Sequence, residues 1–219
     1  MIFLKEKFIS IQGEGLNIGR PALFIRTAYC NLRCPWCDTK YSWTSGKPIG
    51  IDELAREISS SGVSLVVITG GEPLIYSYEI AQLLMILRDE GYEGTIQIET
   101  NGSIEPKPLK NLDNYVLTLS PKVTCNYKVY FIDTLRRLLN QYRVLELKLV
   151  VTKNDIRCLK SFLWELGTIE VPVILQPLHR TNKNYADETR ELVEFILSDK
   201  ELRGRVRVIP QLHKLIGVK

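Results

Sequence analysis

The sequence contains no apolar run of about 18 residues, the length that a membrane-spanning helix needs. Neither sign of charge dominates, because 29 Lys and Arg against 25 Asp and Glu give a net charge of +4. This excess of positive charge is small and evenly spread along the sequence. It points weakly to an anionic ligand and does not predict a nucleic-acid groove. Lys5, Glu6 and Lys7 stand where a signal peptide needs its apolar stretch, so no export signal is expected.

Internal repeats, low-complexity segments and linker-like stretches are also missing from the 219 residues. Apolar residues make up 45% of the chain and charged residues 25%, which is the balance of a folded globule and not of a disordered chain. A chain of this length can bury a substantial core within one domain. We therefore expect a single domain over residues 1–219.

Cysteine is scarce but clustered, since three of the five cysteines, Cys30, Cys34 and Cys37, lie within eight residues. Such crowding suits disulfides poorly, and without an export signal the expected compartment is the reducing cytoplasm. Ligation of a cofactor is the leading hypothesis for this group. Cys125 and Cys158 are expected to be free thiols.

Strand-like and helix-like patterns alternate along the chain. Strands are predicted over 22–28, 64–69, 95–99, 115–119, 144–151, 171–175 and 205–209, and helices over 52–60, 76–90, 135–142, 155–166 and 184–198. Buried strands separated by helices indicate an α/β fold with a parallel sheet. Six βα units are fewer than the eight of a closed barrel, so a partial barrel and a doubly wound open sheet both fit the pattern.

Short polar motifs directly follow six of the predicted strands. They occupy residues 27–30, 69–73, 99–102, 120–122, 152–153 and 176–179. The carboxyl ends of parallel strands are where α/β proteins bind ligands. We therefore expect a single site ringed by these loops.

The clustered cysteines have C-x3-C-x2-C spacing, and thiolates this close together on a loop can wrap a metal centre. Structural zinc takes four closed ligands, whereas only three lie here, so a zinc knuckle would have to borrow Cys125, Cys158 or a histidine. A four-iron cluster held by three cysteines leaves one iron open to a non-protein ligand. The iron–sulfur hypothesis is therefore favoured over zinc.

This loop resembles that of the radical S-adenosylmethionine (SAM) superfamily. The resemblance implies an α/β fold that is a partial (β/α)6 barrel with a modified, shortened helical layer. It also implies a [4Fe-4S] cluster on Cys30, Cys34 and Cys37, whose open iron binds SAM and whose reduced form cleaves SAM to a 5′-deoxyadenosyl radical. Thr69-Gly-Gly-Glu-Pro73 resembles the superfamily's SAM-binding element, in which two glycines permit a close approach of the backbone.

Further motifs narrow the resemblance. They are Phe8–Gly15, Gly19–Pro21, Phe24–Arg26, Cys37–Thr39, Ser120–Lys122 and Pro210–Lys214, and together they resemble the 7-carboxy-7-deazaguanine synthase family over nearly the whole chain. The resemblance implies radical ring contraction of 6-carboxy-5,6,7,8-tetrahydropterin to 7-carboxy-7-deazaguanine with loss of ammonia, supported by Mg²⁺, in 7-deazapurine (queuosine or archaeosine) biosynthesis. One departure is Tyr29, where the family often has glycine before the first cysteine.

The resemblance also assigns roles to single residues, none of them an acid or base. The Ile11-Gln12-Gly13 backbone would read the pterin edge, and Arg26 would clamp the substrate carboxylate unless it forms a structural ion pair. Thr39 would offer a hard oxygen to Mg²⁺. The remaining candidates are Glu14, Thr69 and His213 for the substrate, and Gly71, Glu72, Ser120, Pro121, Lys122, Gln176, Pro177, Leu178 and His179 for SAM.

Several partners are implied by the same resemblance: a flavodoxin or ferredoxin as electron donor and a second copy of the chain in a homodimer, without direct binding to nucleic acid or a membrane. Two alternatives stay open. A radical SAM activase that makes a glycyl radical on a large partner protein shares the cysteine loop and the compact size, but it has no pterin to bind. A non-catalytic zinc or iron–sulfur scaffold is distinguished by its iron content and by the lack of SAM cleavage.

Overall fold

The computed structural model describes residues 1–179 and 184–218. Within them a nine-stranded sheet runs in the order β11-β10-β9-β6-β5-β4-β2-β1-β3, and β7 and β8 form a separate hairpin. The strands are β1 (Ile2–Ile11), β2 (Pro21–Thr27), β3 (Lys47–Ile49), β4 (Leu65–Gly70), β5 (Thr95–Thr100), β6 (Val116–Leu119), β7 (Lys122–Thr124), β8 (Tyr127–Val129), β9 (Val144–Val151), β10 (Val173–Pro177) and β11 (Val206–Val208).

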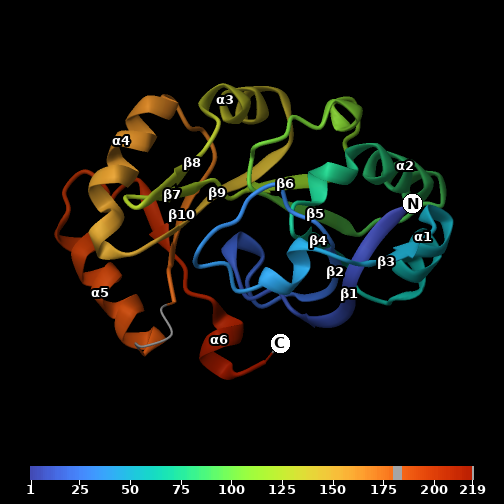
Figure 1. Cartoon of the computed structure of the whole chain (residues 1–219), viewed down its shortest axis with the longest axis horizontal. Helices are drawn as coiled ribbons and strands as arrows, with labels where there is room; N and C mark the ends of the chain where they lie inside the picture. Colours follow the sequence, from blue (N-terminus) through green and yellow to red (C-terminus); the bar gives the residue numbers. More distant parts are fainter. Residues whose placement is uncertain (180–183, 219) are drawn as a thin grey trace.

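Helices connect most of the parallel strands. The α-helices are α1 (Ile51–Ser60), α2 (Ser77–Asp89), α3 (Ile132–Gln141), α4 (Ile156–Leu166), α5 (Tyr185–Ser198) and α6 (Leu212–Ile216), and short 3₁₀ turns lie at η1 (Gly15–Asn17), η2 (Lys40–Trp43), η3 (Pro73–Tyr76), η4 (Lys107–Leu109) and η5 (Lys153–Asp155). Figure 1 shows α1 to α5 following one another around the periphery of the sheet, whereas α6 lies apart from them near the C-terminus. No helix in the described part of the chain is long and apolar enough to cross a bilayer.

Strand order decides between the two architectures that the sequence pattern allows. From β2 to β11 the neighbouring strands follow chain order, and each pair is parallel. A doubly wound sheet reverses its order at a switch point, whereas right-handed crossovers without reversal place the connecting helices on one face, as in a barrel wall. The described sheet ends at β11 and β3, so the barrel-like wall stays open and agrees with the expected partial barrel.

The sequence pattern does not predict the antiparallel strands. β1 pairs with β2 and β3, and its charged residues Lys5, Glu6 and Lys7 obscure the alternation. The strand register also shifts between Leu4 and Glu6, a bulge that breaks the two-residue period. The first strand of the sheet is therefore β1, and the cysteine loop follows the second strand. Between β5 and β6 the chain forms only the turn η4, as its prolines indicate.

The core lies where the periodic segments meet. Leu65, Val66 and Val67 of β4 have no exposed surface, as expected for a strand covered on both faces. The apolar stripe of α2, from Ile80 to Leu87, packs in one cluster with Val66, whereas Leu65 and Val67 belong to a second cluster with Ala22. Each fully buried Leu or Ile stabilises the fold by about 1.5–3 kcal/mol relative to exposure. This core fixes the sheet that carries the functional loops.

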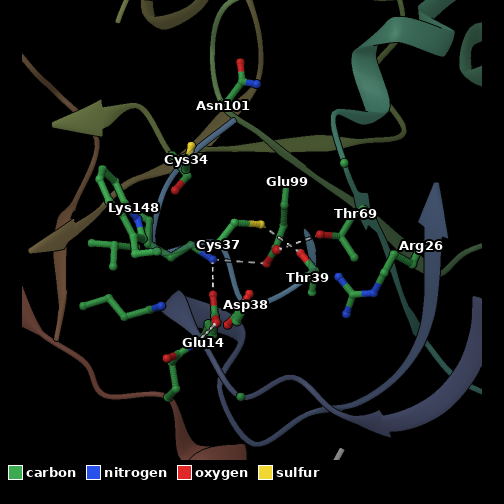
Figure 2. Close-up of a pocket in the computed structure, with 18 of the residues that line it drawn as sticks. Glu14, Arg26, Cys34, Cys37, Asp38, Thr39, Thr69, Glu99, Asn101 and Lys148 are labelled. Atoms are coloured by element: carbon green, nitrogen blue, oxygen red, sulfur yellow. Dashed lines mark hydrogen bonds and ion pairs between the residues drawn. The ribbon is translucent and has the colours of Figure 1, made fainter. Parts of the chain in front are cut away.

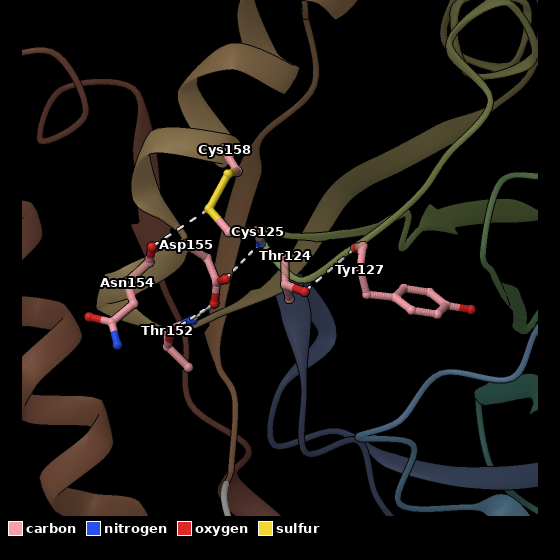
Figure 3. The surroundings of a disulfide bond; sticks show 7 residues. All are labelled: Thr124, Cys125, Tyr127, Thr152, Asn154, Asp155 and Cys158. Atoms are coloured by element: carbon pink, nitrogen blue, oxygen red, sulfur yellow. Dashed lines mark hydrogen bonds between the residues drawn. A yellow bond between two sulfur atoms is a disulfide. The ribbon is translucent and has the colours of Figure 1, made fainter.

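The expectation of free thiols at Cys125 and Cys158 is wrong. The two residues form a disulfide with a Cα–Cα distance of 5.4 Å (Figure 3). Cys125 lies in the turn between β7 and β8, and Cys158 lies on α4. The hairpin brings that turn onto the helix, a tertiary contact that a sequence separation of 33 residues does not reveal. The three clustered cysteines are free, as predicted.

Candidate active site

One large cavity of about 1090 Å³ opens at the carboxyl ends of the parallel strands. Its walls come from the end of β1, from the loops after β2, β4, β5, β6 and β10, from the inner part of β9, and from the C-terminal segment. The cavity, called the active-site pocket below, therefore unites nearly all of the expected polar loops. The exception is residues 152–153: Thr152 caps η5 through Asp155 and does not line the pocket.

The three cysteines of the C-x3-C-x2-C loop all line the active-site pocket. Cys34 is buried, Cys30 and Cys37 are half-buried, and a turn closes between the Cys37 amide and the Cys34 carbonyl at 3.1 Å. Burial raises the pKa of the Cys30 and Cys34 thiols, so a bound metal has to supply the charge that keeps them ionised. In the described residues no three His, Cys, Asp or Glu side chains gather as they do around a single metal ion.

Two glycines bring the loop after β4 against the cysteine loop. A Cβ atom on Gly71 would lie 1.9 Å from the Tyr29 carbonyl oxygen, and one on Gly70 would lie 2.3 Å from that of Thr27. Gly70 also has a φ of +136°, a conformation that side chains disfavour. The Gly71 amide donates to the Thr27 carbonyl at 3.1 Å. The Gly-Gly pair is therefore required by close packing beside Cys30.

Glu72 has a different environment from the one its assignment to SAM requires. Its carboxylate is fully buried and accepts hydrogen bonds from the amides of Leu74 and Asn101, at 3.0 and 2.8 Å, and from the Thr100 hydroxyl at 2.7 Å. Burial raises its pKa despite these donors. Glu72 does not line the active-site pocket but ties the loops after β4 and β5 together. Pro121 and Pro177 also lie outside the lining, which includes every other candidate residue.

The far side of the pocket carries the other SAM candidates. Ser120 accepts a hydrogen bond from Lys122 Nζ at 3.0 Å, and Gln176 is 3% exposed. The side-chain oxygen of Gln176 is buried without a hydrogen-bond partner among the described residues. Buried acceptors are rarely left unpaired, and doing so costs about 1–3 kcal/mol. A polar ligand at this wall would satisfy Gln176, so the residues fit a nucleoside-like group such as that of SAM.

A buried charge network forms the floor near β1. Lys148 is 3% exposed, pairs with the Glu14 carboxylate and lies 3.4 Å from Glu99 Oε1 (Figure 2). Glu99 also accepts hydrogen bonds from Gln12 at 3.1 Å and Thr69 at 3.2 Å. Burial opposes ionisation of Glu14, but the Lys148 charge and the hydrogen bonds from Lys148 and Gln211 together outweigh it and lower the pKa of Glu14 to about 2. The same carboxylates raise the pKa of Lys148 above its usual value.

Arg26 forms the structural ion pair that is the alternative interpretation of its position, and it also lines the active-site pocket. Its Nε donates to Glu6 Oε1 at 2.7 Å. A guanidinium has five N–H donors, so an ion pair through Nε orients the group and leaves its fork for a ligand. Figure 2 shows Arg26 beside Thr39 and Thr69. The Thr39 hydroxyl lies 3.5 Å from Cys37 Sγ, which places a hard oxygen next to the cysteine loop.

The C-terminal segment closes the substrate side. The Leu212 amide donates to the Gly13 carbonyl at 2.8 Å, and Gln211 Nε2 donates to Glu14 at 2.6 Å. A Cβ atom on Gly13 would lie 2.1 Å from His213 Nδ1, so this ring packs directly on the Gly13 backbone. Burial lowers the pKa of His213 below its usual value even though Glu14 opposes the shift. The tail therefore lies against the residues expected to read the substrate.

Sequence reasoning missed several residues of this pocket. Glu99 ends a predicted strand and opens an expected polar loop but was given no role, and Lys148 interrupts an apolar strand, so polar residues at strand positions were the available signal. Asp38 and Lys214 belong to the motifs Cys37–Thr39 and Pro210–Lys214 but were given no role, and their contact across the chain could not be read from spacing. Gln211 lies next to His213 in the tail motif.

The parallel α/β wall, the three free cysteines and the Gly-Gly loop beside them define a radical SAM protein. Residues 24–127 match the sequence model of the radical SAM superfamily. A [4Fe-4S] cluster and SAM are the cofactors of this class.

Similarity to known proteins is more specific. The 7-carboxy-7-deazaguanine synthase of Aquifex aeolicus is 37% identical, covering 100% of this chain and 95% of the relative. That of Pyrobaculum aerophilum is 35% identical over 95% of this chain and 91% of the relative. The crystal structure of QueE from Escherichia coli superposes with a TM-score of 0.72 at 29% identity, covering 97% of this chain and 94% of that one. The chain belongs to the 7-carboxy-7-deazaguanine synthase family.

Proposed function

We propose that the chain catalyses the radical ring contraction of 6-carboxy-5,6,7,8-tetrahydropterin to 7-carboxy-7-deazaguanine with loss of ammonia, a step of 7-deazapurine biosynthesis. The observation that carries the proposal is the shared pocket: the cysteine loop and the Glu14–Lys148–Glu99 network line one cavity, closed by the C-terminal segment. A radical generated at one wall therefore has a polar, fixed substrate site within the same enclosure.

The [4Fe-4S] cluster, when bound, supplies the electron for reductive cleavage of SAM. Cys30, Cys34 and Cys37 are the residues that would hold it, and three ligands leave one iron open for SAM. Gly71, Ser120, Lys122, Gln176, Leu178 and His179 would line the SAM side. Glu72, Pro121 and Pro177 would act on SAM only through their neighbours, by fixing the loops that carry Gly71, Lys122 and Leu178.

The substrate side is built from groups complementary to a carboxypterin. The backbone of Ile11 to Gly13 and the Glu14 carboxylate would pair with the donor and acceptor edge of the pterin ring. Arg26 and His213 would bind its carboxylate, and Thr69 would add a hydroxyl contact. Thr39 would place its hydroxyl on Mg²⁺, whose remaining positions would be filled by substrate and water.

The setting of the reaction belongs to the same proposal. The cluster has to be reduced, so a flavodoxin or ferredoxin would dock near the cysteine loop. We propose that the protein works in the cytoplasm as a homodimer and that it does not bind nucleic acid directly. The disulfide at Cys125 is compatible with this compartment, because disulfides occur inside some cells, notably those of hyperthermophiles.

One anaerobic incubation tests the reaction. Reconstituted protein, SAM, dithionite, Mg²⁺ and 6-carboxytetrahydropterin are combined, and carboxydeazaguanine and 5′-deoxyadenosine are followed by mass spectrometry. The proposal expects carboxydeazaguanine. Deoxyadenosine without carboxydeazaguanine would move the assignment to another substrate or to a glycyl-radical activase, and neither product from cluster-loaded protein would favour a scaffold.

Two variants assign the residues. Cys34→Ala should abolish SAM cleavage in a folded chain, and Ser198→Ala is its control, because that serine ends α5 and lies outside the pocket lining. Thr39→Ala should weaken the dependence of turnover on Mg²⁺ more than it weakens SAM binding. An unchanged Mg²⁺ response would show that Thr39 is only a loop residue.

A further inference from the structure

The β7–β8 hairpin has no part in the main sheet, yet it lies next to the active-site pocket. Its first residue, Lys122, lines the pocket, and β7 packs against β9 and α4. Each of its strands has only three residues. Isolated two-stranded hairpins are marginally stable at best in water, so this one depends on attachments at its turn and its flanks.

The turn of the hairpin is attached to α4 and its N-terminal cap at two points. Cys125 forms the disulfide with Cys158, and its backbone amide donates to Asp155 Oδ1 at 2.9 Å (Figure 3). Asp155 is itself held by the Thr152 amide and hydroxyl, at 2.9 and 2.7 Å. The covalent bond and the hydrogen bond act on the same residue, so the turn has little freedom to move relative to the helix.

Tyr127, two residues further along, contacts the cysteine loop. Its ring meets Trp36 edge to face, with centroids 5.1 Å apart and an interplanar angle of 83°. Its side chain also interacts with the Cys34 thiol and with the Arg33 backbone. Trp36 lies directly before Cys37 in the chain. The Tyr127 side chain therefore contacts the cysteine loop at Cys34 and at Trp36, the residue next to Cys37.

We propose that Tyr127 is a positioning residue for the iron–sulfur cluster, held in place by the Cys125–Cys158 disulfide. The inference rests on the assignment of the cluster to Cys30, Cys34 and Cys37. An O–H group that donates to a ligating thiolate stabilises the additional negative charge of the reduced cluster and so raises its reduction potential. The ring on Trp36 restrains the loop and limits the access of solvent to the cluster.

The first test removes single groups from Tyr127. Tyr127→Phe should shift the midpoint potential of the cluster to a more negative value, measured on anaerobic, SAM-free protein by redox titration with EPR detection. Iron release to a chelator should be about tenfold faster, at the low end of the about 10–100-fold loss that follows removal of the outer hydrogen-bond partners of metal ligands. Tyr127→Leu, which also removes the ring, should release iron faster still.

Tyr130→Phe is the matched control. Tyr130 follows β8 directly, its hydroxyl interacts with Glu165, and its ring packs on Phe162. Tyr130→Phe removes the same hydroxyl group as Tyr127→Phe, but from a side chain that does not contact the cysteine loop. The midpoint potential of the cluster and the rate of iron release should therefore equal those of the wild type. Equal values for Tyr127→Phe and Tyr130→Phe would overturn the positioning role.

The second test removes the anchor. Cys125→Ser combined with Cys158→Ser breaks the bond whatever reductant is used during cluster reconstitution. This double variant should change the potential and iron release in the same direction as Tyr127→Phe, by a smaller amount, because the Asp155 contact remains. Wild-type values in the double variant would overturn the anchoring role. So would complete alkylation of both cysteines in unreduced wild-type protein.

These measurements need no pterin substrate, so they separate this inference from the proposed function. Wild-type protein that holds a cluster while Tyr127→Phe changes nothing contradicts only the inference. Wild-type protein that cannot hold a cluster contradicts both proposals, and Cys34→Ala provides the reference for complete loss. A normal cluster with no carboxydeazaguanine contradicts only the proposed function.

Discussion

Lys214 Nζ lies 3.1 Å from Asp38 Oδ2, which joins the C-terminal helix α6 to the cysteine loop across the mouth of the active-site pocket. Asp38 lies between Cys37 and Thr39, and Lys214 follows His213. The pair therefore links the proposed metal side of the site to the proposed substrate side. The Lys214 and Asp38 side chains are 23% and 56% exposed. An exposed ion pair contributes about 0.2–1 kcal/mol, so opening this contact would cost little free energy.

Lys214→Glu should raise the KM for the pterin about two- to fivefold with little change in kcat. Reversing the charge removes up to about 1 kcal/mol from the closed tail, and a tenfold change in affinity corresponds to about 1.4 kcal/mol. Added salt should raise the wild-type KM toward that of the variant, because exposed charges are screened. Arg190→Glu breaks a comparable exposed pair with Asp187 on α5 and should leave KM unchanged. A KM equal to wild type in Lys214→Glu would exclude a role of the pair in closure.

Tyr29 is the one non-glycine residue with positive φ among the described residues, at φ 69°. Its amide donates to the Ser42 carbonyl and its carbonyl accepts from Glu72, both at 2.8 Å, so this backbone is fixed. An L-residue in the left-handed conformation costs about 1–2 kcal/mol, which glycine avoids. The conformation at position 29 therefore favours glycine, and the two backbone hydrogen bonds hold it with tyrosine in place.

Tyr29→Gly should therefore be more stable than Tyr29→Ala by about 1 kcal/mol, measured by urea unfolding of the apo-protein. Both variants lose the ring contact with Phe3, so their difference isolates the backbone. Phe131 is a matched control, since it is similarly exposed but has a φ of −124°. There glycine should be the less stable of the two replacements. The same order at both positions would contradict backbone strain at Tyr29.

The predictable part of the fold consists of segments with a simple period. The apolar run of β4 and the stripe of α2 have boundaries within one or two residues of those expected. β1 was missed because it alternates around charged residues, and the β7–β8 hairpin because strands of three residues carry too little pattern. The disulfide depends on where that hairpin packs, which no local signal encodes.

The residues of the candidate site also fall into those that could be predicted from the sequence and those that could not. Cys30, Cys34 and Cys37 are close in sequence, so their shared role could be read from spacing. Lys148 and Glu14 are 134 residues apart, and no local pattern shows that they are partners. Only the tertiary fold, which brings the segment after β1 against β9, joins them.

Gly13→Ala should displace the tail without touching the cluster. The added Cβ would lie 2.1 Å from His213 Nδ1 and 3.0 Å from the His213 amide, so the ring and its backbone have to shift. We expect a higher KM for the pterin and unchanged SAM affinity, measured by steady-state kinetics and equilibrium binding. Gly204→Ala is the control, because a Cβ there meets no atom within 4 Å. Weaker SAM binding with an unchanged pterin KM would show that the tail contacts SAM and not the pterin, which contradicts the proposed role.

Lys148→Met should cost about 3–5 kcal/mol of unfolding free energy at pH 7, because it leaves the carboxylates of Glu14 and Glu99, each only 17% exposed, without their cation. In the wild type the pKa of Glu14 is lowered to about 2, so its contribution is present above its usual value of 4.5 and is lost as the pH falls toward 2. In the variant, burial without Lys148 raises that pKa above its usual value, so the variant is destabilised as the pH rises through it. Both effects make the difference in unfolding free energy between wild type and Lys148→Met smaller in acid.

Urea unfolding of the apo-proteins between pH 4 and 8 measures this difference. Adding Glu14→Gln to Lys148→Met should recover part of the lost stability at pH 7, since it removes one of the unpaired carboxylates. Lys7→Met breaks the more exposed pair with Glu57 and should change stability by less than about 1 kcal/mol at every pH. A difference for Lys148→Met that does not become smaller in acid would mean that lost packing, and not unpaired charge, is the cause. The network would then stabilise the pocket through its shape, and the Glu14 carboxylate would be ionised without needing Lys148.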